Sequence, residues 1–320
     1  MFLKELTELS GVSGNEYEVR NFIKKQLQEM GCNYTIDKLG NIIAHNVGNK
    51  ENNKTIMLVA HMDEVGFIVT GIDESGFIKF KSVGGIDERI LISKVVEIGE
   101  NKINGVIGSK PIHLMSKNER GKPQGIDKLY IDIGSVSKTE TEKIVKIGNY
   151  ISFKSNYVEF GDNMIKAKAL DDRIGCSILL KLLQEKLDID FYVAFTVMEE
   201  VGSIGAKVVA YNVTPDFSIV IEGTISADMP EVEEHEKVTK IGYGPAISIM
   251  DRTTLYDLKL VEYVQEIAKT NNIPCQIRKG TSGGNDAGVI HTSKSGSKVV
   301  SISVPCRYIH SPVSVVSKSD

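Results

Sequence analysis

The chain has 320 residues, of which 41% are hydrophobic and 25% are charged, and its formal net charge is −4. This composition is typical of a globular protein and excludes a disordered, collagen-like or coiled-coil chain. The mildly acidic balance, with no long basic run, argues against nucleic acid or an anionic membrane as a partner. No apolar stretch approaches the roughly 20 residues that span a bilayer.

Two further features point to a cytoplasmic protein. The N-terminal sequence contains acidic residues and no apolar core, so it predicts no targeting segment. The four cysteines are widely separated and include no Cys-x-x-Cys pair, which disfavours a disulfide framework and a structural zinc site. We therefore expect a reducing, cytoplasmic environment.

The first predicted elements are a helix and three strands. Ser13 and Glu16 have the spacing of a capping box, and apolar residues then recur at helical spacing from Val19 to Met30. Residues 34–48 predict two strands joined by a glycine-containing turn. Residues 54–61 contain a continuous apolar run, which is typical of a strand buried on both faces of a sheet.

The pattern changes between residues 67 and 161, where short β-branched runs alternate with Gly, Asp, Asn and Ser. This predicts a small all-β domain inserted into a larger one. From residue 162 onward, helical and strand patterns alternate, with one strand expected over residues 190–200, which favours a mostly parallel sheet covered by helices. We therefore expect an α/β fold in which residues 1–66 and 162–320 form one domain around the inserted β domain.

Polar residues suited to chemistry gather where the predicted elements begin or end. Four of the five groups stand at the carboxyl end of an apolar strand and the fifth begins a helix, so the fold would bring them to one edge of the sheet. Two imidazoles and several carboxylates, without a thiolate, suit zinc or the harder ions cobalt and manganese. The candidate residues are His61, Asp63, Asp171, Asp172, Glu199, Glu200, Glu222 and His310.

Charge counting favours two metal ions at this edge. Asp171, Glu200 and Glu222 supply three negative charges and a bridging hydroxide would supply a fourth, which together balance two divalent cations. Without cations, these carboxylates would repel one another and take up protons. One of the adjacent glutamates, Glu199 and Glu200, can bind metal while the other takes a proton from water.

Each motif also has an ordinary structural explanation. His61 and Asp63 can be a hydrogen-bonded pair at a strand end, and Asp171 and Asp172 can belong to a helix N-cap with an acidic first turn. Arg173 can be a surface or pairing arginine. The joint pattern is more specific than any member, because every group is expected at one edge. The remaining histidines are expected not to bind metal: His45, His113, His235 and His291.

The glycine-rich segment over residues 280–288 leaves two interpretations open. Its backbone can approach a substrate closely, or it can form a turn and a helix cap. The sequence contains no G-x-G-x-x-G motif and no P-loop, so nucleotide binding has no support.

Six short motifs carry a resemblance to a known family. They are, in chain order, AHMDEVGF, ALDDRIG, VMEEVGSIGA, IEGT followed by ADMP, GGNDAG and RYIHSP. Together they resemble the co-catalytic metallo-aminopeptidases of peptidase family 42, the glutamyl or tetrahedral aminopeptidases, some of which are labelled endoglucanases. The resemblance covers essentially the whole chain. It implies an α/β catalytic domain interrupted by a β-barrel-like dimerisation domain, with dimers assembled into a hollow tetrahedron of twelve subunits.

The resemblance also implies a role for each candidate residue. Asp171 would bridge two divalent metal ions per subunit, zinc most readily and cobalt or manganese otherwise. His61 and Glu222 would complete one metal site, and Glu200 and His310 the other. Glu199 would be the general base, and Asp63 would orient a liganding histidine. The substrate would lie near the glycine-rich loop, at Gly283, Gly284 and Asp286.

Two features depart from the family pattern. The position of Glu222 is often aspartate, and the longer carboxylate still binds metal with a different geometry. The sequence also ends soon after RYIHSP, where relatives typically continue into a further helix. We expect this second difference to bear on stability and assembly rather than on the metal ligands.

The leading hypothesis is an aminopeptidase that removes N-terminal residues from peptides with a free α-amine, by a metal-bridged hydroxide and a glutamate general base. A dinuclear-metal deacylase or carboxypeptidase is the alternative. Only the aminopeptidase is expected to require a free α-amine on its substrate, which separates it from this alternative. An endoglucanase is a remote alternative, because adjacent glutamates on an extended segment would point to opposite sides and tryptophan is absent. A non-catalytic metal-binding protein would bind metal and hydrolyse no amide.

Overall fold

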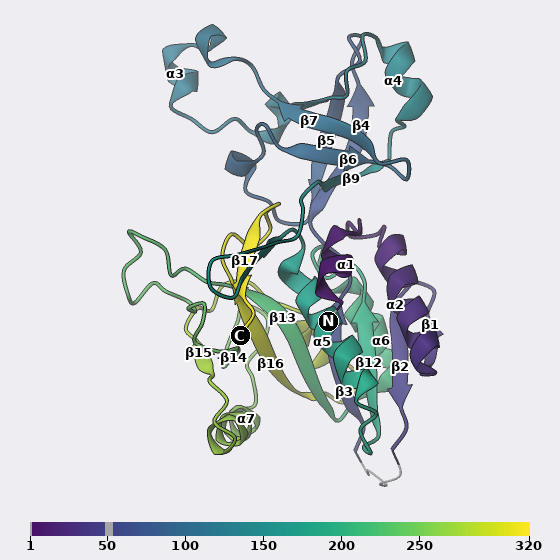
Figure 1. Cartoon of the computed structure of the whole chain (residues 1–320), viewed down its shortest axis with the longest axis vertical. Helices are drawn as coiled ribbons and strands as arrows, with labels where there is room; N and C mark the ends of the chain where they lie inside the picture. The colour runs from purple at the N-terminus through teal and green to yellow at the C-terminus, as the bar shows by residue number, and fades with distance from the viewer. Residues whose placement is uncertain (1, 49–53) are drawn as a thin grey trace.

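The computed structural model describes residues 2–48 and 54–320, and an eight-stranded sheet forms the centre of its larger part (Figure 1). The strand order is β1–β2–β12–β3–β13–β16–β14–β15. The four central strands run parallel and are β12 (Phe191–Thr196), β3 (Ile56–His61), β13 (Phe217–Ile225) and β16 (Lys298–Cys306). The edge strands are β1 (Asn33–Ile36) and β2 (Ile42–Asn46) on one side, and β14 (Ala246–Ser248) and β15 (Gln276–Arg278) on the other.

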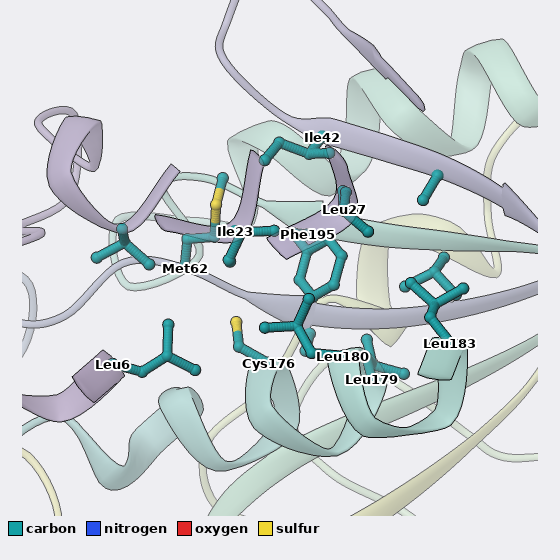
Figure 2. Packing of buried hydrophobic residues seen from close by; sticks show 14 of the residues in the cluster. Leu6, Ile23, Leu27, Ile42, Met62, Cys176, Leu179, Leu180, Leu183 and Phe195 are labelled. Carbon is teal, nitrogen blue, oxygen red and sulfur yellow. The ribbon is translucent and has the colours of Figure 1, made fainter. Parts of the chain in front are cut away.

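Helices cover both faces of this sheet because its central strands are apolar on both sides. Phe195 of β12 points into the core on one face and Ala194 into the core on the other. The helices of the first face are α1 (Leu3–Glu8), α2 (Tyr17–Met30) and α5 (Leu170–Gln184), whose packing Figure 2 shows. Those of the second are α6 (Ile204–Val213), α7 (Leu258–Thr270) and α8 (Ala287–Ile290).

The segment between the sheet strands β3 and β12 begins with a closed six-stranded antiparallel barrel, which stands apart at the top of Figure 1. Its interior has its own apolar core, in which the ring of Phe67 packs edge-on against those of Phe80 and Phe153. The ring centroids are 5.1 and 5.2 Å apart. The strands are β4 (Gly66–Ile72), β5 (Ile78–Val83), β6 (Val95–Ile98), β7 (Ile103–Gly108), β8 (Tyr130–Asp132) and β9 (Tyr150–Phe153). The short helices α3 (Lys117–Arg120) and α4 (Lys138–Ile144) lie between its strands in sequence. This fold confirms the predicted α/β sheet with an all-β barrel.

A small third sheet was not predicted. It consists of β10 (Val158–Phe160), β11 (Met164–Ala167) and β17 (Ser314–Ser317), all antiparallel. After β16, the chain turns back, so that Val315 of β17 forms an antiparallel bridge with Arg307 while β17 pairs with β11. In the described part of the chain, no helix is long and apolar enough to cross a membrane.

Two local predictions were wrong. Ser13 and Glu16 do not form a capping box, because neither side chain caps α2 and the Ser13 hydroxyl donates to Asp63 at 2.6 Å. The strand expected over residues 190–200 ends at Thr196, and the chain turns after it. In both places a tertiary hydrogen-bond partner overrides the local pattern.

Candidate metal centre and active site

The register of the parallel strands places two candidate residues side by side. His61 is the last residue of β3 and pairs with Thr196 of β12. On the other side of β3, Val59 pairs with Val220 of β13, so Glu222, two residues further on, lies level with His61. These side chains therefore share the carboxyl edge of the sheet, as the sequence predicted.

Asp171 and Asp172 reach the same edge from the start of α5, where their backbone is not yet helical. The carboxylate of Asp172 accepts the Gly175 N–H at 2.9 Å and the His61 N–H at 3.2 Å. The helix-cap explanation is therefore correct for Asp172. Asp171 instead lines the cleft, beside the candidate ligands. Its carboxylate accepts the Gly223 N–H at 3.1 Å.

Both candidate histidines direct the Nε2 atom toward Asp171. Nδ1 lies 3.2 Å from the Asp63 carbonyl oxygen in His61, and 2.9 Å from the Gly85 carbonyl oxygen in His310. Because a carbonyl only accepts, each Nδ1 carries a proton, so Nε2 is the nitrogen of each histidine that could bind a metal. Nε2 of His61 is 3.5 Å from Oδ1 of Asp171, and Nε2 of His310 is 3.4 Å from Oδ2.

The remaining carboxylates complete two sets of ligand atoms. Oε1 of Glu222 is 3.2 Å from His61 Nε2, and Oε2 of Glu200 is 3.3 Å from His310 Nε2. Two ligands bound to one tetrahedral zinc at about 2.0–2.1 Å lie roughly 3.3 Å apart, so these separations fit shared ions. Oε2 of Glu222 is buried and has no hydrogen-bond partner among the described residues, as expected of a donor meant for a cation.

Glu199 lies within reach of the same atoms. Its carboxylate groups with His61 and Glu222, and Asp171 and Glu200 form a second group with the same histidine, each within 4.8 Å. His61 offers a single nitrogen and can serve one ion only, so both groups cannot be complete metal sites at once. The second imidazole beside Asp171 and Glu200 comes from His310.

The clustered residues open into a cleft of about 480 Å³. Glu199 and Glu200 both line this cleft, which corrects the expectation that an extended segment would point them to opposite sides. Gly283 and Gly284 also line it. Asp286 does not: it is buried behind the wall, where one oxygen accepts the Thr196 hydroxyl at 2.6 Å.

Known proteins have the same fold and a similar sequence. A family model described as M42 glutamyl aminopeptidase matches residues 40–320. The chain belongs to the M42 family. A putative aminopeptidase from Acetivibrio thermocellus is 41% identical over 99% of this chain and 93% of its own. An aminopeptidase structure from the archaeon Desulfurococcus kamchatkensis is 37% identical with a TM-score of 0.94, covering 100% of this chain and 90% of its own. The TET1 peptidase of Pyrococcus horikoshii, described as assembling into a tetrahedron or a large octahedral shell, is 33% identical with a TM-score of 0.87, covering 98% and 93%.

In this M42 site, the pKa values of the two adjacent glutamates lie above their usual range. Burial, and then the neighbouring carboxylate of Glu222, raise the pKa of Glu199 well above its usual value. Burial likewise raises the pKa of Glu200 to about 7. Asp171 differs, because the imidazoles of His310 and His61 lower its pKa although burial opposes ionisation. Bound cations would take the place of the retained protons.

Sequence reasoning missed two arginines that line the cleft. Arg278, on β15, is nearly buried and donates from Nη2 to the Ser282 carbonyl oxygen at 2.6 Å and from Nη1 to that of Gly280, so it holds the glycine-rich loop. Arg252 lines the same cleft with an exposed side chain. Arg278 ends β15, a three-residue edge strand without an apolar run, and Arg252 lies in the loop between β14 and α7, so the pattern of apolar strand ends gave no signal for them. The two groups of metal-ligand atoms found among the described residues contain none of His45, His113, His235 and His291.

Proposed function

We propose that this M42 family member is a dinuclear metallo-aminopeptidase. The observation that carries the proposal is Asp171, whose two oxygens face separate imidazoles, those of His61 and His310. A carboxylate with one imidazole lone pair near each oxygen suits a pair of ions better than a single ion. Asp171 would serve both ions, with His61 and Glu222 on the first and Glu200 and His310 on the second.

The donor set, nitrogen and oxygen without sulfur, fits zinc first and cobalt or manganese next. Two such ions, when bound, supply activation of a water and polarisation of the scissile carbonyl. Glu199 would accept the proton of the attacking water and return it to the leaving amine. The free α-amine of the substrate would lie beside one of the ions or a carboxylate of the site, which would restrict cleavage to the N-terminus.

For the domains, we propose residues 1–66 and 162–320 as the catalytic domain and residues 67–161 as a dimerisation domain. Support comes from exposed apolar side chains on the inserted segment, among them Ile112, Leu114 and Val136. With the TET1 peptidase as precedent, of which one structure is described as a dodecamer, we expect dimers assembled into a larger homo-oligomer of twelve subunits. A cytoplasmic location stays a prediction.

The decisive experiment compares one mixed set of peptides, free and N-acetylated, by mass spectrometry over time, with and without a chelator and metal add-back. Stepwise loss of N-terminal residues from free peptides only, abolished by the chelator and restored by zinc, cobalt or manganese, is the expected result. Cleavage of acetylated peptides, or loss from the other end, would favour the deacylase or carboxypeptidase. Release of reducing sugar from cellulose that is insensitive to the chelator would favour the endoglucanase.

A further inference from the structure

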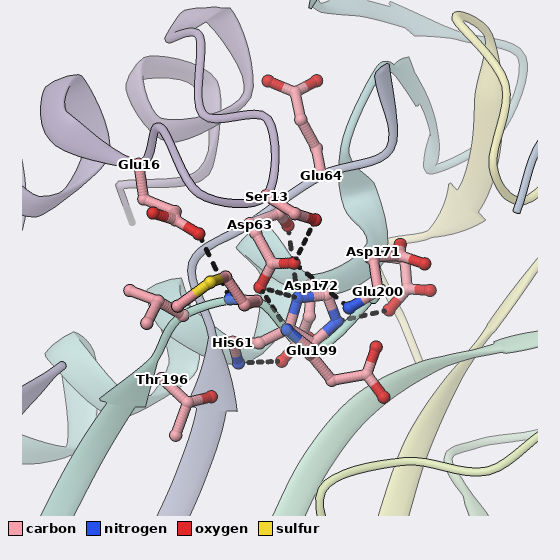
Figure 3. A network of polar contacts seen from close by, with 12 residues as sticks. Ser13, Glu16, His61, Asp63, Glu64, Asp171, Asp172, Thr196, Glu199 and Glu200 are labelled. Atoms are coloured by element: carbon pink, nitrogen blue, oxygen red, sulfur yellow. Dashed lines mark hydrogen bonds and ion pairs between the residues drawn. The ribbon is translucent and has the colours of Figure 1, made fainter. Parts of the chain in front are cut away.

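Glu199 and Glu200 follow β12, and side chains from other segments of the chain hold their backbone in place (Figure 3). Oδ1 of Asp63 accepts the Glu199 N–H at 2.9 Å, and Oδ2 accepts the Glu200 N–H at 3.1 Å. The hydroxyl of Ser13 donates to the same Oδ2 at 2.6 Å. Asp63 is fully buried, so water cannot replace these bonds cheaply.

The two preceding amides are held in the same way. Val197 donates its N–H to Oδ1 of Asn41 at 2.9 Å, and Met198 donates to Oε1 of Glu16 at 3.1 Å. The same Glu16 oxygen accepts the Gly14 N–H at 2.7 Å. Side chains from three distant segments thus replace the strand partner that four successive amides lack after β12 ends.

Met198 is the point at which the chain changes direction. Its φ of 55° lies in the left-handed region, which is unfavourable for a residue other than glycine. Such a conformation persists only where surrounding contacts determine it. It brings both following glutamates into the cleft.

We propose that Glu16 is a positioning residue for the general base. By accepting the Met198 N–H, it fixes the left-handed turn and so the place of the Glu199 carboxylate beside the ligands. Glu16 is 2% exposed and does not line the cleft, so it acts through the backbone and touches no substrate. The inference rests on the aminopeptidase function proposed above.

What the turn requires from Glu16 is an acceptor at a fixed place, not a negative charge. Glutamine keeps an oxygen at the Oε1 position, whereas aspartate keeps the charge and withdraws the oxygen by one methylene. Alanine removes the acceptor and leaves a buried N–H unpaired. A displacement of about 1 Å at a reacting group can cost about 10²-fold in rate.

The test measures kcat, KM, metal content and melting temperature for E16Q, E16D and E16A. We expect E16D and E16A to lose about 10- to 100-fold in kcat, with KM within about twofold and metal content unchanged. E16Q should stay within about threefold of the wild type. The matched control is E18A, two residues further on in the first turn of α2, which removes the acceptor for the Ser10 N–H and the Lys102 ion pair and should leave kcat unchanged.

A second readout needs no activity. Hydrogen exchange of the amides over residues 197–200 should become faster in E16D and E16A but not in E16Q or E18A. If E16A does not fold, E16D against E16Q carries the comparison alone.

Three results would overturn the inference: E16D with wild-type kcat and exchange, E16Q as slow as E16D, or a kcat loss that follows loss of metal. If the wild type cleaves no peptide, the proposed function fails, and the exchange pattern still decides whether Glu16 holds the turn.

Discussion

At the residue scale, neighbouring acids in this site have different tasks because their backbones present them differently. Asp172 accepts backbone N–H groups from α5 and from His61, while Asp171 faces the two imidazoles. The next pair, Glu199 and Glu200, shares one cleft because a left-handed residue precedes it. Residue type alone would not separate a metal ligand from a structural acid in either pair.

Glu199→Gln tests the general base. The amide keeps the size of the side chain, and the backbone N–H that binds Asp63 is untouched, so the turn and the metal ligands should remain. General acid–base catalysis typically contributes about 10²–10⁴-fold, and we expect kcat to fall by about 10³-fold or more with metal content unchanged. Steady-state kinetics with elemental analysis measures both. The contrasting variant, His61→Ala, should lose metal as well as turnover, and full activity in Glu199→Gln would remove this residue from the mechanism.

At the element scale, strand periodicity predicted most of the sheet because the central strands are buried on both faces, a condition that leaves a strong apolar signal. The same signal located most of the metal-ligand candidates, since all but Asp171 lie near the carboxyl ends of those strands or follow them. It missed β14 and β17, which are only three and four residues long. It also misplaced Ser13 and Glu16, whose partners lie about 50 and 182 residues away in the chain, where no local pattern can reveal them.

An ion pair between elements predicts a pH dependence of stability. Asp228, after β13, accepts from Nε and Nη2 of Arg307, after β16, at 2.8 and 2.7 Å. Although burial opposes ionisation, this arginine and the Ser226 hydroxyl lower the pKa of Asp228 from 3.8 to about 2. Since the folded pKa lies below the unfolded one, the stabilisation is complete above about pH 4 and is lost as the pH falls toward 2.

Asp228→Asn should therefore lower the free energy of unfolding by about 1–2 kcal/mol at pH 6, and the difference from the wild type should shrink at pH 3. Urea unfolding at both pH values measures this difference. Glu185→Gln, which breaks the exposed pair with Lys181, is the control and should change stability little at either pH. A difference that is the same at pH 6 and pH 3 would contradict the ion-pair explanation.

At the scale of the whole molecule, the inserted barrel segment contacts the candidate site of the larger part. It encloses its own apolar core, and the segment after β5 supplies the Gly85 carbonyl that fixes the proton of His310. The inserted segment thus contributes to the candidate metal centre while it exposes apolar side chains. A sequence pattern predicts the inserted strands but not this contact, because Gly85 and His310 are 225 residues apart.

The proposed dimerisation through the barrel can be tested at that surface. Ile112 and Leu114 are 66% and 61% exposed and lie two residues apart on the inserted segment, so together they offer an apolar contact to a second subunit. If they lie in a contact between subunits, the double substitution Ile112→Asp and Leu114→Asp would bury unpaired charges there, so the assembly should fall apart into smaller species. Light scattering coupled to size exclusion measures the mass. Val47→Asp, at an equally exposed position (65%) on the catalytic part, should leave the mass unchanged. An unchanged mass in the barrel variant would mean that subunits associate through another face.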